Sequence, residues 1–173
     1  PLECALVQGA TSIRAMARGQ NFGVISRALA IRTADPRGEE IPFFRSIWIE
    51  RPGVAATALV FTALLDSESA TGAFRFTLRP GDVTVTDVEA TLFPRVALDN
   101  VGLAPMQGTS LFGPLDRRRF DDIRPAVYET SGLSMRTGAD EWLWRPVSNR
   151  ESLQISAFVD RDPKGFGLVQ RER

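Results

Sequence analysis

Two tryptophans separated by one residue, Trp142 and Trp144, form the most suggestive aromatic pair in a chain that holds three tryptophans in total. They belong to the stretch EWLWRP, which begins at Glu141 and ends at Pro146. In a β-strand the two indoles point to one face, while Glu141 and Arg145 point to the other. Two interpretations stay open. The indoles fill a core, or they form a wall that stacks on a neutral polar ligand, a role that suits large, rigid, half-polar rings.

Acid–base chemistry in this chain has to rely on carboxylates, because the sequence contains no histidine and only one cysteine, Cys4. The lack of histidine excludes a Ser-His-Asp triad, a Cys-His dyad and most zinc sites. Lysine, tyrosine and arginine remain as supporting groups. Asp66 follows the apolar run Leu59–Leu65. It is either a functional acid or a turn residue that caps local N–H groups.

A second polar region lies between Asp121 and Leu133. It contains a proline and lacks the periodicity of a strand. Loops of this kind on a rigid sheet often carry function. The alternative interpretation is a plain surface loop.

Charge and composition argue against several classes of partner. Lys+Arg and Asp+Glu are both 21, so the net charge is zero, which argues against nucleic acid and anionic membranes. No run of about 18 apolar residues is present, so no membrane-spanning helix is predicted. Gly165–Gly167 does not fit the dinucleotide-binding pattern, and the acidic residues are too scattered for a calcium loop. We therefore predict no cofactor and no metal.

The elements that must position these residues are short β-strands. Ala73–Arg79 alternates between apolar and polar residues, as a half-buried strand does. Pro80–Asp82 then forms a turn. The same alternation predicts strands at Leu153–Ala157 and Phe166–Gln170.

Other segments depart from this simple alternation. Val24–Ile31 and Leu59–Leu65 are more continuously apolar, which is typical of strands covered on both faces. The parity of the pattern slips near Thr86 and Asp87, which suggests a bulge or a break. The most helix-like stretch, Thr11–Arg18, is short.

Short strands separated by turns rich in proline and glycine, with no long amphipathic helix, predict an all-β, mainly antiparallel sandwich or barrel. A chain of 173 residues suits one domain with a real core. No internal repeat or interdomain linker appears, so residues 1–173 are predicted to form a single domain. Both ends of the sequence look cut, and we expect a segment of a longer protein.

Many segments, taken in order, resemble the periplasmic glucan biosynthesis protein G/D family, which handles osmoregulated β-1,2-linked glucans in Gram-negative bacteria. The resemblance extends over nearly all of the 173 residues. The matching pieces include Gly19–Gly23, Arg37–Pro42, Phe44–Pro52, Ala63–Ser67, Ala70–Phe76, Leu111–Pro114, Ser131–Leu133, Glu141–Pro146 and Gly165–Arg171.

This resemblance implies a galactose-mutarotase-like supersandwich, of which the chain is an incomplete, central part. It also implies a periplasmic location and β-1,2-glucan or its oligosaccharides as the partner. The implied activity is that of an endo-β-1,2-glucanase, which hydrolyses the bond with inversion between two carboxylates. The family's general acid lies beyond Arg173. The alternative function is therefore a glucan-binding module without hydrolysis.

The resemblance also implies roles for individual residues. The family's general base is an aspartate in a His-Asp-Ser-x-Gly-Leu motif, and Glu129 occupies its position, with Tyr128 in place of the histidine. The extra methylene shifts the carboxylate by about an ångström, a displacement that can lower a rate about a hundredfold. The predicted substrate-binding residues are Asp66, Arg124, Tyr128, Glu141, Trp142, Trp144 and Arg145.

Overall fold

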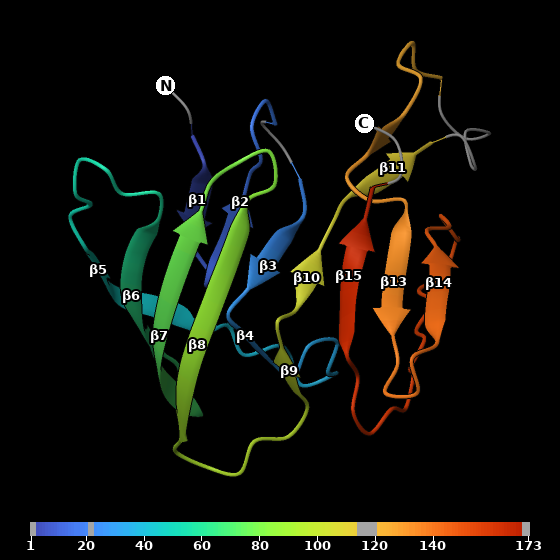
Figure 1. Ribbon diagram of the computed structural model, residues 1–173. Helices are drawn as coiled ribbons and strands as arrows, with labels where there is room; N and C mark the ends of the chain where they lie inside the picture. The colour runs from blue at the N-terminus through green and yellow to red at the C-terminus, as the bar shows by residue number, and fades with distance from the viewer. Residues whose placement is uncertain (1–2, 21–22, 114–120, 171–173) are drawn as a thin grey trace. The chain divides into compact units, whose positions relative to one another are not determined.

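The computed structural model describes residues 3–20, 23–113 and 121–170. Every regular element in these ranges is a β-strand, and the strands pair in antiparallel fashion, so the predicted all-β class is confirmed. The chain divides into two compact units, Pro1–Pro105 and Met106–Arg173. Figure 1 shows the strands of both, and each unit is described by itself.

The first unit is built around a four-stranded sheet whose strands follow one another in chain order. These strands are β5 (Phe43–Ile49), β6 (Leu59–Asp66), β7 (Ala70–Arg79) and β8 (Val85–Pro94). Along β7 the side chains of Phe74, Phe76 and Leu78 are buried, whereas Arg75 and Arg79 are exposed. The predicted period-two strand is therefore confirmed.

Shorter strands form the rest of the first unit. Consecutive antiparallel strands β1 (Ala5–Gln8), β2 (Ser12–Ala15) and β3 (Ile25–Arg27) lie side by side. Strand β4 (Leu29–Ile31) pairs with β9 (Val101–Leu103). Of the run Val24–Ile31, which was predicted to be covered on both faces, Leu29, Ala30 and Ile31 are buried, whereas residues 24–28 are half-buried.

The core of this unit lies between the four-stranded sheet and β4. Leu29 and Ile31 pack in one cluster with Phe61, Phe74 and Phe76 of the sheet. The rings of Phe61 and Phe76 stack at 4.6 Å between centroids. Two β layers that bury facing apolar side chains make a sandwich, which agrees with the predicted architecture.

Three predictions about local structure in this unit are wrong. The helix-like stretch at Thr11–Arg18 instead contains strand β2. Ala10 and Thr11 take positive φ angles of 58° and 56°, which reverse the chain and pair β2 with β1. A helix of that length has too few hydrogen bonds to outweigh such pairing.

The bulge expected near Thr86 is absent from the β7–β8 pair, which runs in unbroken register from Val85 to Pro94. The register shift lies in β5 instead, between Phe44 and Ser46. Leu59–Leu65 is not covered on both faces by the described residues, since its side chains alternate and Leu64 is exposed. Apolar residues on an exposed face, such as Val85 and Leu64, disturbed both sequence patterns.

The second unit has a three-stranded antiparallel sheet in the order β14–β13–β15. Its strands are β13 (Gly132–Arg136), β14 (Trp142–Pro146) and β15 (Gly165–Val169). Strand β10 (Met106–Gln107) precedes it, and β11 (Ser110–Phe112) pairs with β12 (Val127–Tyr128). The strands predicted at EWLWRP and from Phe166 are confirmed, and β14 lies at a sheet edge, where the missing N–H of Pro146 is tolerated.

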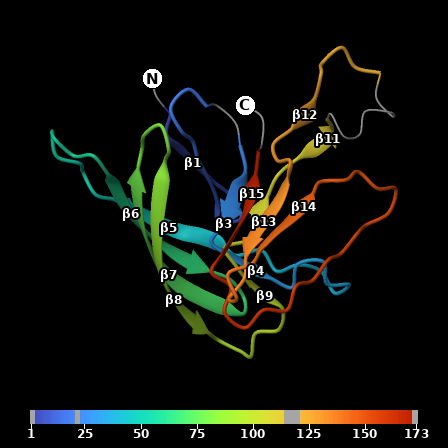
Figure 2. The same ribbon diagram turned by 45° about the vertical axis from the view of Figure 1, so that its right-hand side comes forward.

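The strand predicted at Leu153–Ala157 is wrong. The chain between β14 and β15 contains no strand, and Leu153 and Ile155 are exposed. Figure 2 shows this orange-to-red segment as a long loop. Alternation alone cannot make a strand where no neighbouring strand supplies hydrogen bonds.

A buried carboxylate, Glu40, holds the turn between β6 and β7. Its Oε1 accepts the N–H of Ser69 at 2.8 Å, and its Oε2 accepts the Ser69 hydroxyl at 2.6 Å. Arg32 lies 3.5 Å from Oε2. Burial alone would raise the pKa of Glu40, but the hydrogen bonds from Ser69 and the charge of Arg32 outweigh it and lower the pKa below 4.5.

Glu40→Gln is expected to lower the free energy of unfolding at pH 7 by about 1–3 kcal/mol, because charge-assisted hydrogen bonds are lost. A depressed pKa stabilises the folded state above about pH 4.5 and stops doing so as the pH falls through the folded-state pKa. Thermal unfolding of the complete protein at pH 7 and in acid checks this. Wild type should lose more stability in acid than Glu40→Gln, with Glu68→Gln as an exposed control. Equal acid losses in wild type and Glu40→Gln would contradict the assignment.

Candidate functional site

The two tryptophans of β14 lie on the same face of the three-stranded sheet. The register pairs Trp142 with Arg136 and Trp144 with Ser134, both on β13. Residues directly opposite each other on neighbouring strands point to the same side of a sheet. The indoles, Ser134 and Arg136 therefore share one face, called here the indole face.

Of the two interpretations of these indoles, burial in a core is wrong within the described part of the chain. Trp142 is 70% exposed and Trp144 is 37% exposed. The guanidinium carbon of Arg136 lies 5.8 Å from the Trp142 ring centroid, which is cation–π range. A wall of exposed aromatic rings is what stacking on a ligand requires.

Trp144 is held by a close approach to the backbone of β13. A Cβ added at Gly132 would lie 2.8 Å from Cζ2 of Trp144 and 2.3 Å from the carbonyl oxygen of Arg145. Any larger residue at Gly132 would push the indole or the neighbouring strand away. Glycine at this position therefore fixes the indole against the sheet.

Glu141 and Arg145 lie away from the indoles, as predicted from alternation. Arg145 points to the opposite face, where its guanidinium carbon lies 5.3 Å from the ring centroid of Phe158. Glu141 precedes β14, and its backbone N–H donates to Oγ1 of Thr137 at 3.1 Å. Their predicted contacts with substrate stay predictions.

Glu129 follows β12 and is tied to one backbone segment. Its N–H donates to the carbonyl of Thr109 at 2.7 Å, and its Oε2 accepts the Thr109 N–H, also at 2.7 Å. The Thr109 N–H therefore orients the carboxylate of Glu129 through Oε2.

A short connection links Glu129 to the indole face. Thr130 is buried and its hydroxyl donates to the carbonyl of Val169 at 3.2 Å, while Ser131 N–H donates to the same carbonyl. Gly132, under Trp144, is three residues beyond Glu129, and three residues of extended chain span at most about 10 Å. The base candidate and the aromatic wall are therefore neighbours in the second unit.

Two further residues predicted to bind substrate, Arg124 and Tyr128, precede Glu129 in sequence. Tyr128 belongs to β12, where its ring approaches Gly113, at whose position an added Cβ would lie 3.3 Å from Cδ1. Arg124 donates through Nε to Oδ1 of Asp122 at 2.9 Å. Hydrogen bonding to Asp122 raises the pKa of Arg124, which keeps its charge.

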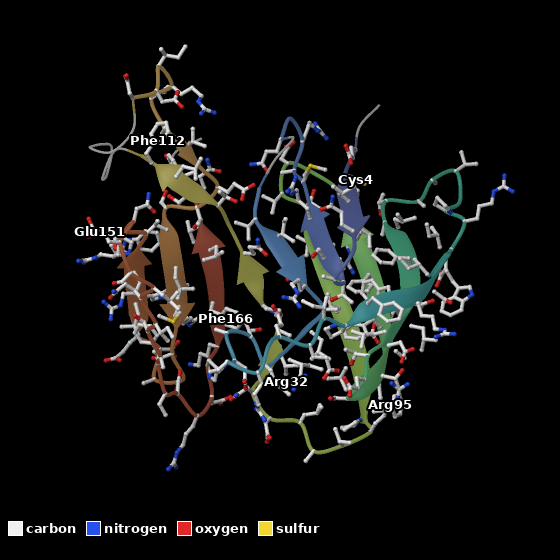
Figure 3. All side chains as sticks on the ribbon, turned by 180° about the vertical axis from the view of Figure 1, so that it is seen from behind. Cys4, Arg32, Arg95, Phe112, Glu151 and Phe166 are labelled. Carbon is white, nitrogen blue, oxygen red and sulfur yellow. The ribbon has the colours of Figure 1, made fainter. Side chains whose placement is uncertain are left out.

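Asp66 belongs to the first unit and is paired with two arginines. Its Oδ1 lies 2.8 Å from Nη2 of Arg95, and its Oδ2 lies 3.3 Å from Nη1 of Arg45. Arg95 lies just beyond β8 (Figure 3). Its hydrogen bond is the main cause that lowers the pKa of Asp66. An ion-paired carboxylate can still accept hydrogen bonds from hydroxyl groups.

Sequence reasoning missed a hollow of about 590 Å³ on the outer face of the four-stranded sheet, whose lining includes Trp48, Arg75 and Glu89. Trp48 is 56% exposed, and Arg75 pairs with Glu50 at 3.0 Å. The available signal was the mixture of aromatic and charged residues around Trp48, which has Arg45 before it and Glu50 after it.

The described residues contain no group of three or more side chains arranged to hold a metal ion. Within the same residues no helix is long and apolar enough to cross a membrane.

Comparison with known proteins gives a consistent result. The family model described as "Periplasmic glucan biosynthesis protein, MdoG" matches residues 2–173. "Glucans biosynthesis protein G" of Bradyrhizobium diazoefficiens is 51% identical over 171 residues, which cover 99% of this chain and 34% of that protein. The proteins of the same name from Shewanella sp. strain ANA-3 and Vibrio cholerae are 52% and 51% identical, with 99% of this chain and 31% of each relative covered. The chain thus spans about a third of the length of these relatives.

Proposed function

The chain belongs to the periplasmic glucan biosynthesis protein MdoG family, and we propose that it supplies a glucan-binding face and one catalytic carboxylate of a periplasmic protein that hydrolyses β-1,2-linked glucan. The observation that carries this proposal is the exposed pair Trp142 and Trp144 on one sheet face, with Trp144 lying against Gly132, which is three residues beyond Glu129. A neutral polymer built of sugar rings suits that combination, since the apolar faces of the rings stack on indoles and the hydroxyls bind polar groups.

The hydrolytic step assigns Glu129 as the general base. In an inverting mechanism one carboxylate takes a proton from water on one side of the sugar, and a carboxylic acid protonates the leaving oxygen on the other. The hydrogen bond from Thr109 to Oε2 orients Glu129 and leaves Oε1 for the water. The general acid is proposed to come from the parent protein beyond this segment, in a larger sandwich domain of the supersandwich type.

A non-catalytic glucan-binding module is the second candidate. It is favoured by the use of one Glu129 oxygen for the backbone of Thr109. A carboxylate that accepts a backbone N–H in this way can have a purely structural role, in which it stabilises the loop and activates no water molecule. In this version the indole face binds the same polymer and no bond is broken.

The remaining predicted contacts are part of the proposal for the whole protein. Asp66, Arg124, Tyr128, Glu141 and Arg145 supply hydrogen bonds to glucan hydroxyls, which charged and phenolic groups form well. Glucan biosynthesis in the periplasm is the setting that the family description supports.

Binding is tested by titrating linear β-1,2-glucan oligosaccharides into the complete protein while tryptophan fluorescence is recorded. We expect a saturable change for wild type and an affinity at least about tenfold weaker for Trp144→Ala, which is within the range for truncating an aromatic anchor. Val54→Ala, an exposed apolar change elsewhere, is the control. Absence of any saturable response in wild type would remove the proposal, and an unchanged affinity in Trp144→Ala would remove the indole face from it.

A further inference from the structure

Strand β15 presents bare backbone to the indole face. The register pairs Gly167 with Ser134 and Gly165 with Arg136. Because Ser134 and Arg136 point to the side of the tryptophans, these two glycines do so as well. Figure 1 shows β15 directly beside β13.

Neither glycine is required by its own backbone or by its neighbours. Among the described residues the glycines with positive φ are Gly19, Gly23 and Gly38, so β15 does not need glycine for its conformation. A Cβ added at Gly165 or Gly167 would meet no atom of residues 3–20, 23–113 or 121–170 within 4 Å. Gly132 on β13 differs, because Trp144 occupies the space above it.

Glycine inside a strand carries a cost, since it loses more chain entropy on folding and contributes no side chain to packing. A glycine that nothing local explains marks a place where a ligand or another backbone approaches closely. Here two such glycines alternate along one strand, on one face, so the open strip is continuous along β15.

The shape of the strip follows from the cross-strand rows. One row runs across the sheet from Trp144 through Ser134 to Gly167. Along this row the side chains decrease in size, from an indole to a hydroxymethyl group to none. The next row runs from Trp142 through Arg136 to Gly165. A flat molecule can lie on β15 with one side against the indoles.

The chemistry of the two faces indicates what lies there. The opposite face of the sheet is mainly apolar and carries Arg145 together with Leu133, Met135, Leu143, Phe166 and Leu168. The indole face has one aliphatic side chain on β15, that of Val169. It also offers a hydroxyl, exposed indoles and a guanidinium already paired with Asp140 at 2.6 Å. This set suits an uncharged, hydroxyl-rich ring better than an apolar protein segment.

We propose that the strip formed by Gly165 and Gly167 is a subsite that seats one sugar ring of the glucan flat on β15, with its edge toward Trp144. The absence of side chains at these two positions is then a determinant of ligand fit. This inference rests on the function proposed above.

A side chain added at Gly167 tests the subsite without removing any contact. Gly167→Val in the complete protein is expected to leave the melting temperature unchanged or slightly raised, because the space is open and valine favours strands. Its dissociation constant for a linear β-1,2-glucan oligosaccharide, measured by calorimetry, should be at least about tenfold weaker. Gly167→Ala should be intermediate. Gly53→Val, at an open position in the first unit, is the matched control.

Each outcome separates the hypotheses. Tight binding by wild type and equally tight binding by Gly167→Val would overturn the subsite and leave the proposed function standing. A fall in melting temperature with Gly167→Val would show that a protein segment covers the strip, which also overturns it. No binding by wild type would remove the proposed function and the subsite together.

Discussion

Glu129→Gln is expected to lower hydrolysis of linear β-1,2-glucan by the complete protein by about 10²–10⁴-fold, the usual contribution of a general base. The amide keeps an oxygen that can accept the Thr109 N–H, as Oε2 does now at 2.7 Å. It cannot take a proton from water. Glucan affinity should therefore stay within about threefold of wild type, because the loss occurs in the transition state.

Product release measured by chromatography, together with binding measured by calorimetry, checks this separation. Glu68→Gln, on the exposed turn between β6 and β7, controls for the loss of one charge. Glu129→Asp keeps a carboxylate at this position and should retain more activity than Glu129→Gln. Full turnover by Glu129→Gln would exclude Glu129 as the base. A wild-type protein that binds glucan and releases no product would favour the binding module.

Phe76→Ala is expected to lower the free energy of unfolding by about 3–5 kcal/mol, the range for truncating a buried phenylalanine. Phe76 is 1% exposed and its ring contacts those of Phe44, Phe61 and Phe74. It joins the four-stranded sheet to the core cluster that includes β4. The loss leaves a cavity that closely packed neighbours can only partly fill.

Urea unfolding of the complete protein, followed by circular dichroism, measures this effect. Phe93→Ala on the neighbouring strand β8 is the matched control. Phe93 is 54% exposed, so its truncation should change the free energy of unfolding only slightly. Similar losses for the two variants would show that the outer face of β8 is buried by another part of the protein. A negligible loss for Phe76→Ala would place the core elsewhere.

The elements that the sequence predicts well are those with a clear period of two and a neighbour on each side. Strand β7 alternates along its whole length and lies between β6 and β8. The face of β14 shared by Trp142 and Trp144 was also predicted, since strand geometry fixes it locally. The exposure of the two indoles could not be predicted, because it depends on which other segments pack against that face.

The features that sequence missed depend on contacts between distant segments. The partners of Asp66 are Arg45 on β5 and Arg95 just beyond β8, which are distant from it in sequence. The open strip on β15 appears only when the register with β13 is known. Leu153–Ala157 alternates as cleanly as a true strand but has no strand beside it. The alternation of residues in the sequence indicates which face of a segment is apolar. Whether the segment forms a strand depends on hydrogen bonds to a neighbouring strand.

The central claim is that the indole face seats glucan beside Glu129, and a crystal structure of the complete Glu129→Gln protein with a linear β-1,2-glucan oligosaccharide tests it most directly. We expect a sugar ring on the bare backbone at Gly167, against Trp144, with the substituted side chain within hydrogen-bond reach of a water or glycosidic oxygen. Sugar density elsewhere, with another segment of the protein lying across Gly165 and Gly167, would contradict it.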